Sequence, residues 1–174
     1  MFVRVLRDGN PELSITVREI KDALIVFGQD YELSMRGMDV ILTDSESQIK
    51  YNSTLLNHHY DTDVITQERE TPMGKHLELF INGTKVFLET TESHQSYILR
   101  MVFHGLLHVM GHTDGTDQDK KKMHLEENRL LKLFHVEHKL KSIWWINMML
   151  LLWGVATQGV RPQGPPRDWA PKHC

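Results

Sequence analysis

Two histidines four residues apart have the residue type and spacing best suited to chemistry in this sequence. His104 and His108 lie in Tyr97–Met110, a stretch that is apolar on nearly every side. Such a stretch predicts a helix buried in a core, and residues four apart in a helix lie one turn above the other on the same face. Two imidazoles placed in this way can share one metal ion.

A glycine and an aspartate follow at positions that complete a ligand set. Gly111 stands where the helix is expected to end, because glycine adopts the left-handed closing conformation at little cost, and Asp114 follows on the returning chain. His104, His108 and Asp114 would offer two nitrogens and one carboxylate oxygen, which suit Zn²⁺ or another divalent transition metal and leave a position for water. His112 is the rival third ligand, which we rank lower because Gly111 should break the helix before it.

Two simpler or different interpretations of the motif compete with a catalytic metal. Paired histidines on a buried helix can be hydrogen-bonded core residues without any ion. A small metalloprotease is the weakest alternative, because Gly105 stands where the HExxH peptidases carry the glutamate that serves as general base.

The stretch His104–Asp114, HGLLHVMGHTD, resembles the signature of the YbeY family of metallo-endoribonucleases, HGxLHLxGxDH. The third histidine of that signature falls on Asp114, and the aspartate before it falls on Thr113. Carboxylate oxygen also binds zinc, so the departure changes the character of the ligand set without abolishing it.

A second stretch supports the resemblance. Asn57–Thr66, NHHYDTDVIT, is similar to the family segment that ends in PTDVLSF, with Asp61 in place of proline. The arginine that the family usually carries six residues before the threonine falls on Leu56, so that basic group is missing. Leu77–Asn82 takes the place of the family strand GDIxIS, and the resemblance extends over roughly Met38 to Leu131.

The resemblance implies a zinc-dependent endoribonuclease that hydrolyses single-stranded RNA in rRNA maturation, including processing of the 3′ end of 16S rRNA, and in ribosome quality control. The implied partners are single-stranded RNA or rRNA and the ribosome or its small subunit, and DNA is not expected as a substrate. No catalytic residue is assigned beyond the ligands, because both the adjacent glutamate and the family arginine are absent. The alternative is a non-catalytic ribosome-assembly module in which a structural zinc holds the Gly111–Asp114 turn to the helix.

Composition predicts one domain followed by a tail. With 174 residues, 40% of them hydrophobic, the chain can bury one sizeable core, and we expect a hydrolase domain at residues 1–138. The formal net charge is −3, and residues 139–174 contribute +4 through five basic side chains and one acidic side chain, which leaves −7 for the domain. An RNA substrate would therefore need a local groove or delivery by a partner, because proteins that bind chiefly by neutralising phosphates are usually basic.

The same composition bears on location and on the tail. The single cysteine, Cys174, cannot form an intramolecular disulfide, and no apolar leader opens the sequence, so we expect a cytoplasmic protein. Residues 142–160 carry no charge, but their strongly apolar part is shorter than the roughly 20 residues that cross a bilayer, so membrane association of the tail is not expected. Residues 161–166 are rich in proline and glycine, as disordered segments are.

Apolar spacing and capping patterns predict a single α+β domain, in which a small mixed sheet packs on the buried central helix that carries the metal site. A capping-box pattern at Ser45–Gln48 should open a helix that carries Ile49, Leu55 and Leu56 inward. Glu126 and Glu127 are expected to be at the surface of the last helix or partly packed. The predicted strands are 2–6, 38–43, 63–67 and 77–81. The predicted helices are 16–28, 45–57, 84–91, 97–110 and 116–133, with Ser93 as a candidate cap of the central one.

Overall fold

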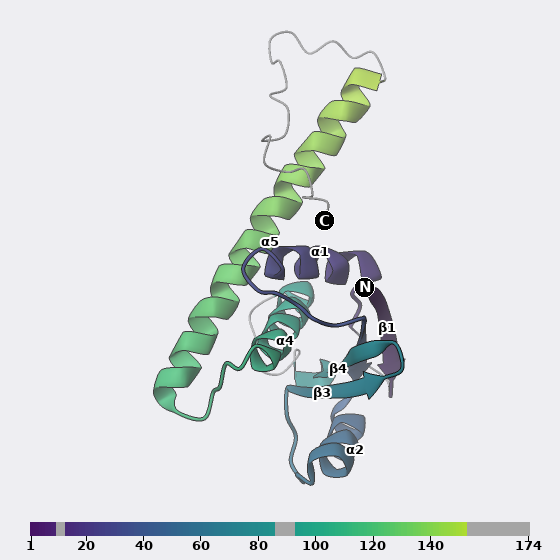
Figure 1. The fold of residues 1–174 in the computed structure, drawn as a ribbon. Helices are drawn as coiled ribbons and strands as arrows, with labels where there is room; N and C mark the ends of the chain where they lie inside the picture. Colours follow the sequence, from purple (N-terminus) through teal and green to yellow (C-terminus); the bar gives the residue numbers. More distant parts are fainter. Residues whose placement is uncertain (10–12, 86–92, 153–174) are drawn as a thin grey trace. The chain divides into compact units, whose positions relative to one another are not determined.

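In the computed structural model, four strands form one mixed sheet whose spatial order differs from their order in the chain (Figure 1). The first two strands of the order β1-β2-β4-β3 pair in parallel, as do β2 and β4, whereas β3 runs antiparallel to β4 and lies at the edge. The predicted mixed sheet is confirmed. The strands are β1 (Phe2–Asp8), β2 (Gly37–Thr43), β3 (Val64–Thr71) and β4 (Gly74–Asn82).

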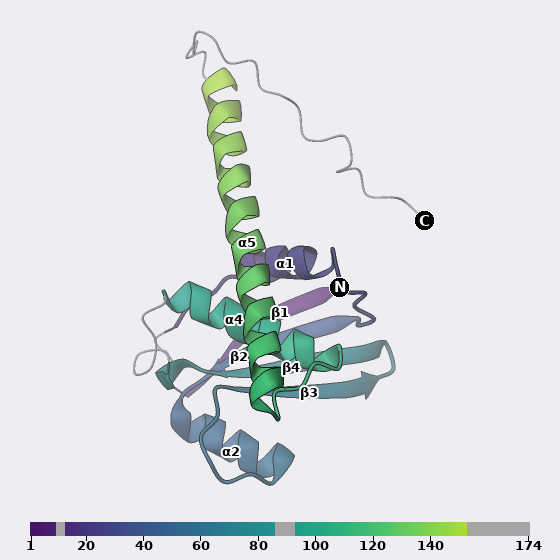
Figure 2. The same cartoon turned by 90° about the vertical axis from the view of Figure 1, so that its left-hand side faces the viewer.

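Helices cover both faces of the sheet. Helices α1 (Val17–Phe27) and α4 (His94–Val109) lie on one face and α2 (Ser45–Leu56) lies on the other (Figure 2). Every residue of β2 is buried as a result, which is usual for a parallel strand covered on both sides. The larger core joins α1 and α4 to the inward residues of the sheet, and the smaller core under α2 is built on Ile41, Ile65 and Phe80.

Helix α4 is the buried central helix that its apolar sequence predicts. Its N-cap is Ser93, the candidate cap in the sequence, whose hydroxyl accepts a hydrogen bond from the backbone N–H of Ser96, and its C-cap is Met110. Gly111 follows with φ of 87°, the left-handed conformation expected of it. The buried residues of α4 are Tyr97, Ile98, Leu99, Met101, Val102, Phe103, Gly105, Leu106 and Leu107.

Helix α5 (Asp117–Leu152) begins where the sequence predicts but does not end near Leu133. The Thr116 hydroxyl accepts a hydrogen bond from the backbone N–H of Asp119 at 3.2 Å, which confirms the predicted cap. Good helix-forming residues continue without a glycine or proline as far as Leu152, so nothing in the sequence stops the helix earlier.

The structure describes residues 1–9, 13–85 and 93–152. Contacts divide the chain into two units, residues 1–136 and residues 137–174. The predicted domain boundary after residue 138 stays a prediction. Most of the predicted helix 84–91 and the proline- and glycine-rich end of the tail lie outside the described residues. Within the described part of the chain, no helix has both the length and the apolar character needed to cross a membrane.

Helix α2 differs from its prediction at its start and in the side chains that it buries. Its N-cap is Asp44, whose carboxylate accepts from the backbone N–H of Ser47 at 2.9 Å, so the helix begins one residue earlier than a cap at Ser45 would place it. Ile49 and Leu56 are exposed, and the fully buried side chains are the amides Gln48 and Asn52. These amides are buried because they bind backbone oxygens, Gln48 that of Phe80 at 3.2 Å and Asn52 that of Tyr60 at 2.8 Å.

Charged side chains occupy the part of this sheet face that lies beyond α2. Asp39, only 3% exposed, receives the Arg4 guanidinium on both of its oxygens and lies 3.1 Å from Nε2 of His76. Burial alone would raise the pKa of Asp39, but the hydrogen bonds from Arg4 and His76 outweigh burial and lower that pKa below its usual range. The carboxylate of Asp39 therefore stabilises the fold in its ionised form.

We predict that Asp39→Asn lowers the free energy of unfolding at pH 7 by about 1–3 kcal/mol, because it removes the charge from a buried hydrogen-bonded pair. The folded-state pKa of Asp39 is lowered, so its stabilisation is present above its unfolded pKa of about 3.9 and is lost as the pH falls through the folded pKa. Urea unfolding of both proteins between pH 7 and pH 3 should show the gap closing at the acid end. An unchanged gap at pH 3 would contradict this role.

Candidate metal centre

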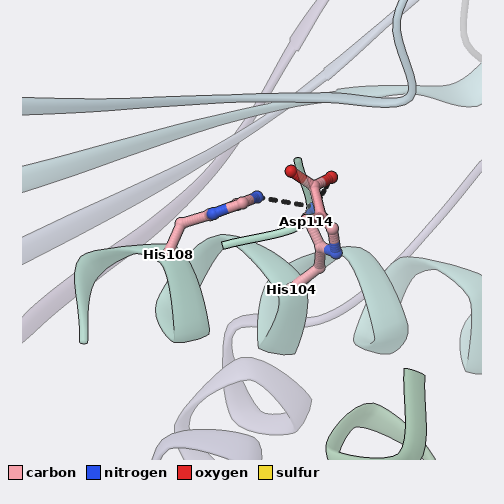
Figure 3. Close-up of side chains that lie close together, drawn as sticks. All are labelled: His104, His108 and Asp114. Atoms are coloured by element: carbon pink, nitrogen blue, oxygen red, sulfur yellow. Dashed lines mark hydrogen bonds and ion pairs between the residues drawn. The ribbon is translucent and has the colours of Figure 1, made fainter. Parts of the chain in front are cut away.

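Two imidazole nitrogens face each other on one side of α4. Nε2 of His104 lies 2.9 Å from Nε2 of His108, and the two rings are nearly perpendicular, at 84° (Figure 3). The spacing of four residues in a helix produces this proximity, as the sequence predicts. Both rings lie near the carboxyl end of α4, where the helix dipole favours a positive charge.

The opposite ring nitrogens decide which atoms carry hydrogen. Nδ1 of His104 lies 2.7 Å from Oε1 of Glu127, and Nδ1 of His108 lies 2.9 Å from the carbonyl oxygen of His112. An ionised carboxylate and a carbonyl can only accept, so each Nδ1 carries the hydrogen and each neutral ring has its lone pair on Nε2. Two lone pairs held 2.9 Å apart repel each other, and a cation between them removes the repulsion.

Asp114 brings an anionic oxygen to the same place. Its Oδ2 lies 3.9 Å from Nε2 of His104, and one possible ligand atom from each of His104, His108 and Asp114 falls within 4.8 Å of the others. The aspartate side chain is 47% exposed, so one side of the group is open to solvent. The structure thus brings the three predicted ligands together, with a donor set that fits Zn²⁺ and similar divalent ions.

A tight turn returns the chain from the helix end to the histidines. The Gly111 N–H donates to the carbonyl of His108 at 2.9 Å, and the His112 N–H donates to the carbonyl of Leu107 at 3.0 Å. With Gly111 in the left-handed conformation, these bonds reverse the chain, so that Asp114 lies beside the helix it has just left.

His112, the rival ligand, points elsewhere. Its Nε2 lies 3.4 Å from the hydroxyl of Tyr31, and its ring meets the Tyr31 ring edge-on. The Tyr31 hydroxyl donates to Oε1 of Glu126 at 2.8 Å, and burial together with this bond raises the pKa of Tyr31 to about 12. His112 contributes its backbone carbonyl to His108 and does not offer its ring to the site.

Gly105 explains why the glutamate of a metallopeptidase is absent. A Cβ atom at this position would lie 2.6 Å from Cδ2 of Leu79 and 2.9 Å from the hydroxyl of Thr66. Position 105 therefore faces the sheet at very close range, on a side of α4 that has no room for a carboxylate. This packing argues against the metalloprotease interpretation on grounds independent of the motif.

Glu127 is more deeply buried than the sequence prediction of a surface or partly packed residue. It is 4% exposed, and it accepts from His104 and from Nη1 of Arg100, the latter at 3.3 Å. A signal for this was present in the sequence, because Glu127 interrupts the apolar stripe of α5. The buried apolar members of that stripe are Met123, Leu130, Leu131 and Phe134.

Two positions that depart from the YbeY pattern lie at the end of α2 and in the loop before β3. Leu56, which takes the place of the family arginine, is exposed at the end of α2. Asp61, which takes the place of proline, accepts from the Asn82 amide at 2.6 Å and from the Ser45 hydroxyl at 3.1 Å. These bonds join the start of α2 to the end of β4, so Asp61 fixes the loop before β3.

A hollow of about 280 Å³ borders the turn that carries Asp114. Residues of the turn line one side, and residues of the first turns of α5 line the other. Lys122, whose side chain is 65% exposed, is the basic residue on this wall. The lining residues are Met110, Gly111, His112, Thr113, Asp119, Lys122 and Met123.

Comparison with known proteins finds one family. The model of the family described as Endoribonuclease YbeY matches residues 12–135. Endoribonuclease YbeY of Cytophaga hutchinsonii is 29% identical over 119 residues, which cover 66% of this chain and 83% of that protein. The protein of the same name from Salinibacter ruber is 32% identical over 110 residues, which cover 56% of this chain and 70% of that protein. The one from Chlamydia caviae is 27% identical over 142 residues, which cover 75% of this chain and 90% of that protein.

A solved structure has a similar fold. The solution structure of TM1509 from Thermotoga maritima superposes with a TM-score of 0.51 at 21% sequence identity. The alignment covers 80% of this chain and 93% of that protein. At this level of identity the likeness concerns the fold, and it agrees with the α+β architecture described above.

We predict that Gly105→Val lowers the free energy of unfolding by about 2–3 kcal/mol, because the new side chain overlaps Leu79 and Thr66 in a packed interface. Gly115→Val is the matched control, since a Cβ at Gly115 meets nothing within 4 Å. Urea unfolding should leave the control within about 0.5 kcal/mol of the parent. Equal stability of the two variants would show that α4 does not pack on the sheet at this distance.

Proposed function

The chain belongs to the Endoribonuclease YbeY family, and we propose that it cleaves single-stranded RNA with the help of one divalent ion, Zn²⁺. Membership of this family makes the chain a hydrolase of the endoribonuclease class. We further propose that its substrate is rRNA, that it works on the ribosome or its small subunit during rRNA maturation, and that it does not cleave DNA. The residues that would hold the ion are His104, His108 and Asp114.

The metal proposal rests on one observation about His104 and His108. Their Nε2 atoms lie 2.9 Å apart, while both of their Nδ1 atoms are hydrogen-bonded to acceptors. Without an added positive charge this arrangement sets two lone pairs against each other. The Asp114 carboxylate at 3.9 Å strengthens the demand for a cation. Hydrogen-bonded core histidines without a cation would not need that carboxylate.

The residues of the chain would divide the work of hydrolysis between binding and orientation. A divalent ion in this group supplies Lewis-acid chemistry, which polarises a phosphoryl oxygen and makes water more acidic. The two histidines hold their Nε2 lone pairs toward one point, and Asp114 adds negative charge on the open side. Position 105, next to His104 in the sequence, carries no carboxylate, so a general base of the kind found in HExxH peptidases is absent there.

The acidic domain limits how RNA is held. Residues 1–138 carry a net charge of −7, so general attraction to phosphates is weak and the substrate must be held locally. Lys122 beside the hollow next to Asp114 is placed to contribute one such local contact. Delivery of the substrate by the ribosome would supply the rest, which supports rRNA in its ribosomal context as the substrate.

The test is elemental analysis of the purified full chain together with cleavage of a labelled single-stranded oligoribonucleotide. The parent should contain about one equivalent of metal. His104→Ala and Asp114→Ala should each lose it and lose more than about a hundredfold in cleavage rate, because the ion supplies several kcal/mol of transition-state stabilisation. His94→Ala is the matched control, since His94 is an exposed histidine at the opposite end of the same helix.

The outcomes separate the candidate functions. If the parent contains no metal in chelator-free buffer, the result would favour the interpretation of the two histidines as hydrogen-bonded core residues. Metal in the parent without cleavage of any RNA would favour the ribosome-assembly module with a structural zinc. Cleavage of a DNA strand of the same sequence at a similar rate would contradict the proposed preference for RNA, and purified small subunits bearing an unprocessed 3′ end would test the rRNA substrate directly.

A further inference from the structure

We infer that Glu127 is a positioning residue of the metal centre: from α5 it holds Nδ1 of His104 and so directs the Nε2 lone pair of that ring to the ion. The inference rests on the proposed metal-dependent function. It adds to the three proposed ligands a side chain that does not itself bind the ion. Glu127 and His104 are 23 residues apart in the sequence and lie on different helices.

Both oxygens of the Glu127 carboxylate have defined partners. Oε1 lies 2.7 Å from Nδ1 of His104, and Oε2 accepts from Nη1 of Arg100 at 3.3 Å. Arg100 is itself held by the Asn128 side chain at 2.8 Å, so the arginine fixes the orientation of the carboxylate. A carboxylate whose two oxygens are both hydrogen-bonded cannot rotate freely. It therefore restrains rotation of the His104 imidazole.

The burial of Glu127 indicates that its carboxylate serves an interaction inside the protein and not contact with solvent. The side chain is only 6% exposed and sits in the apolar stripe of α5, where an ionised carboxylate loses most of its hydration. An apolar residue of similar size would pack there without that cost. The bonds to His104 and Arg100 offset the cost, and the bond to His104 is the one that reaches the site.

The consequence for His104 is a fixed tautomer and a more basic ligand atom. A carboxylate that accepts from Nδ1 keeps the hydrogen on that nitrogen and increases the electron density on Nε2. His108 obtains the same tautomer from a backbone carbonyl, which no substitution removes. Glu127 is thus the side chain through which the orientation of a metal-binding histidine can be altered without touching a ligand.

The neighbouring Glu126 provides a matched control on the same helix. Its carboxylate accepts from the Tyr31 hydroxyl at 2.8 Å and from Arg129, and neither partner is a proposed ligand. The hydrogen bond from Arg129 lowers the pKa of Glu126, and the hydrogen bond from Tyr31 lowers it further by a smaller amount. Replacing Glu126 by glutamine therefore removes a charge and a structural bond of the same kind while leaving His104 and its partner intact.

The experiment is titration of the metal-free full chain with Co²⁺, comparing the parent, Glu127→Gln and Glu126→Gln. Glu127→Gln should weaken Co²⁺ binding by about 10–100-fold and change the visible absorption of the bound ion, because the charge that fixes His104 is gone. Glu126→Gln should bind Co²⁺ as the parent does. Urea unfolding of each metal-free protein shows how much stability each substitution costs, so that a loss of affinity is separated from a loss of fold.

The results distinguish this inference from the proposed function. If the parent binds Co²⁺ and Glu127→Gln binds it equally tightly with the same spectrum, Glu127 has no positioning role and the metal centre stands. Equal weakening in both glutamine variants would also overturn the inference, since it would trace to stability alone. A parent that binds no ion overturns the metal centre itself.

A measurement on the parent alone covers the case in which Glu127→Gln does not fold. Long-range proton–nitrogen NMR of the zinc-loaded chain reports the tautomer of each histidine. The geometry predicts that the Nδ1 resonance of His104 has the shift of a protonated nitrogen and that its hydrogen is protected from exchange by the buried carboxylate. A rapidly exchanging Nδ1 hydrogen on His104 would overturn the role of Glu127.

Discussion

The close contact of α4 with the sheet at Gly105 is the constraint on which the site depends. Because position 105 has no side chain, the helix approaches Leu79 and Thr66 at a distance that would exclude even a methyl group. This contact fixes the rotation of α4 about its axis. Once the rotation is set, His104 and His108 lie together on one partly buried face of α4, and the apolar residues between them face the core.

The remaining parts of the site are supplied by segments that pack on α4. The Gly111 turn contributes the His112 carbonyl and carries Asp114, and α5 contributes Glu127 from within its apolar stripe. Tyr31, in the loop after α1, contacts the ring of His112. Two helices and one short turn therefore define the orientation of the two imidazoles, which is more rigid support than a loop alone would provide.

The departures from the family pattern change the electrostatics of the site. A carboxylate at position 114 adds a negative charge where the pattern has a neutral imidazole, and such a set accommodates harder divalent ions more readily. The leucine at position 56 lacks the positive charge that the pattern carries there. Both changes make the chain more acidic than the pattern implies, and they agree in sign with the acidic domain as a whole.

Features set by near neighbours in the chain were predictable from the sequence, whereas features set by distant partners were not. The helical spacing of His104 and His108 and the turn at Gly111 depend on residues within about four positions, so local stereochemistry determines them. The burial of Glu127, the exposure of Ile49 and the strand order depend on partners far away in the sequence. Sequence thus determined the candidate ligand group and the ends of its helix. Tertiary packing alone decided which carboxylate binds Nδ1 of His104, because that contact requires α5 to lie against α4.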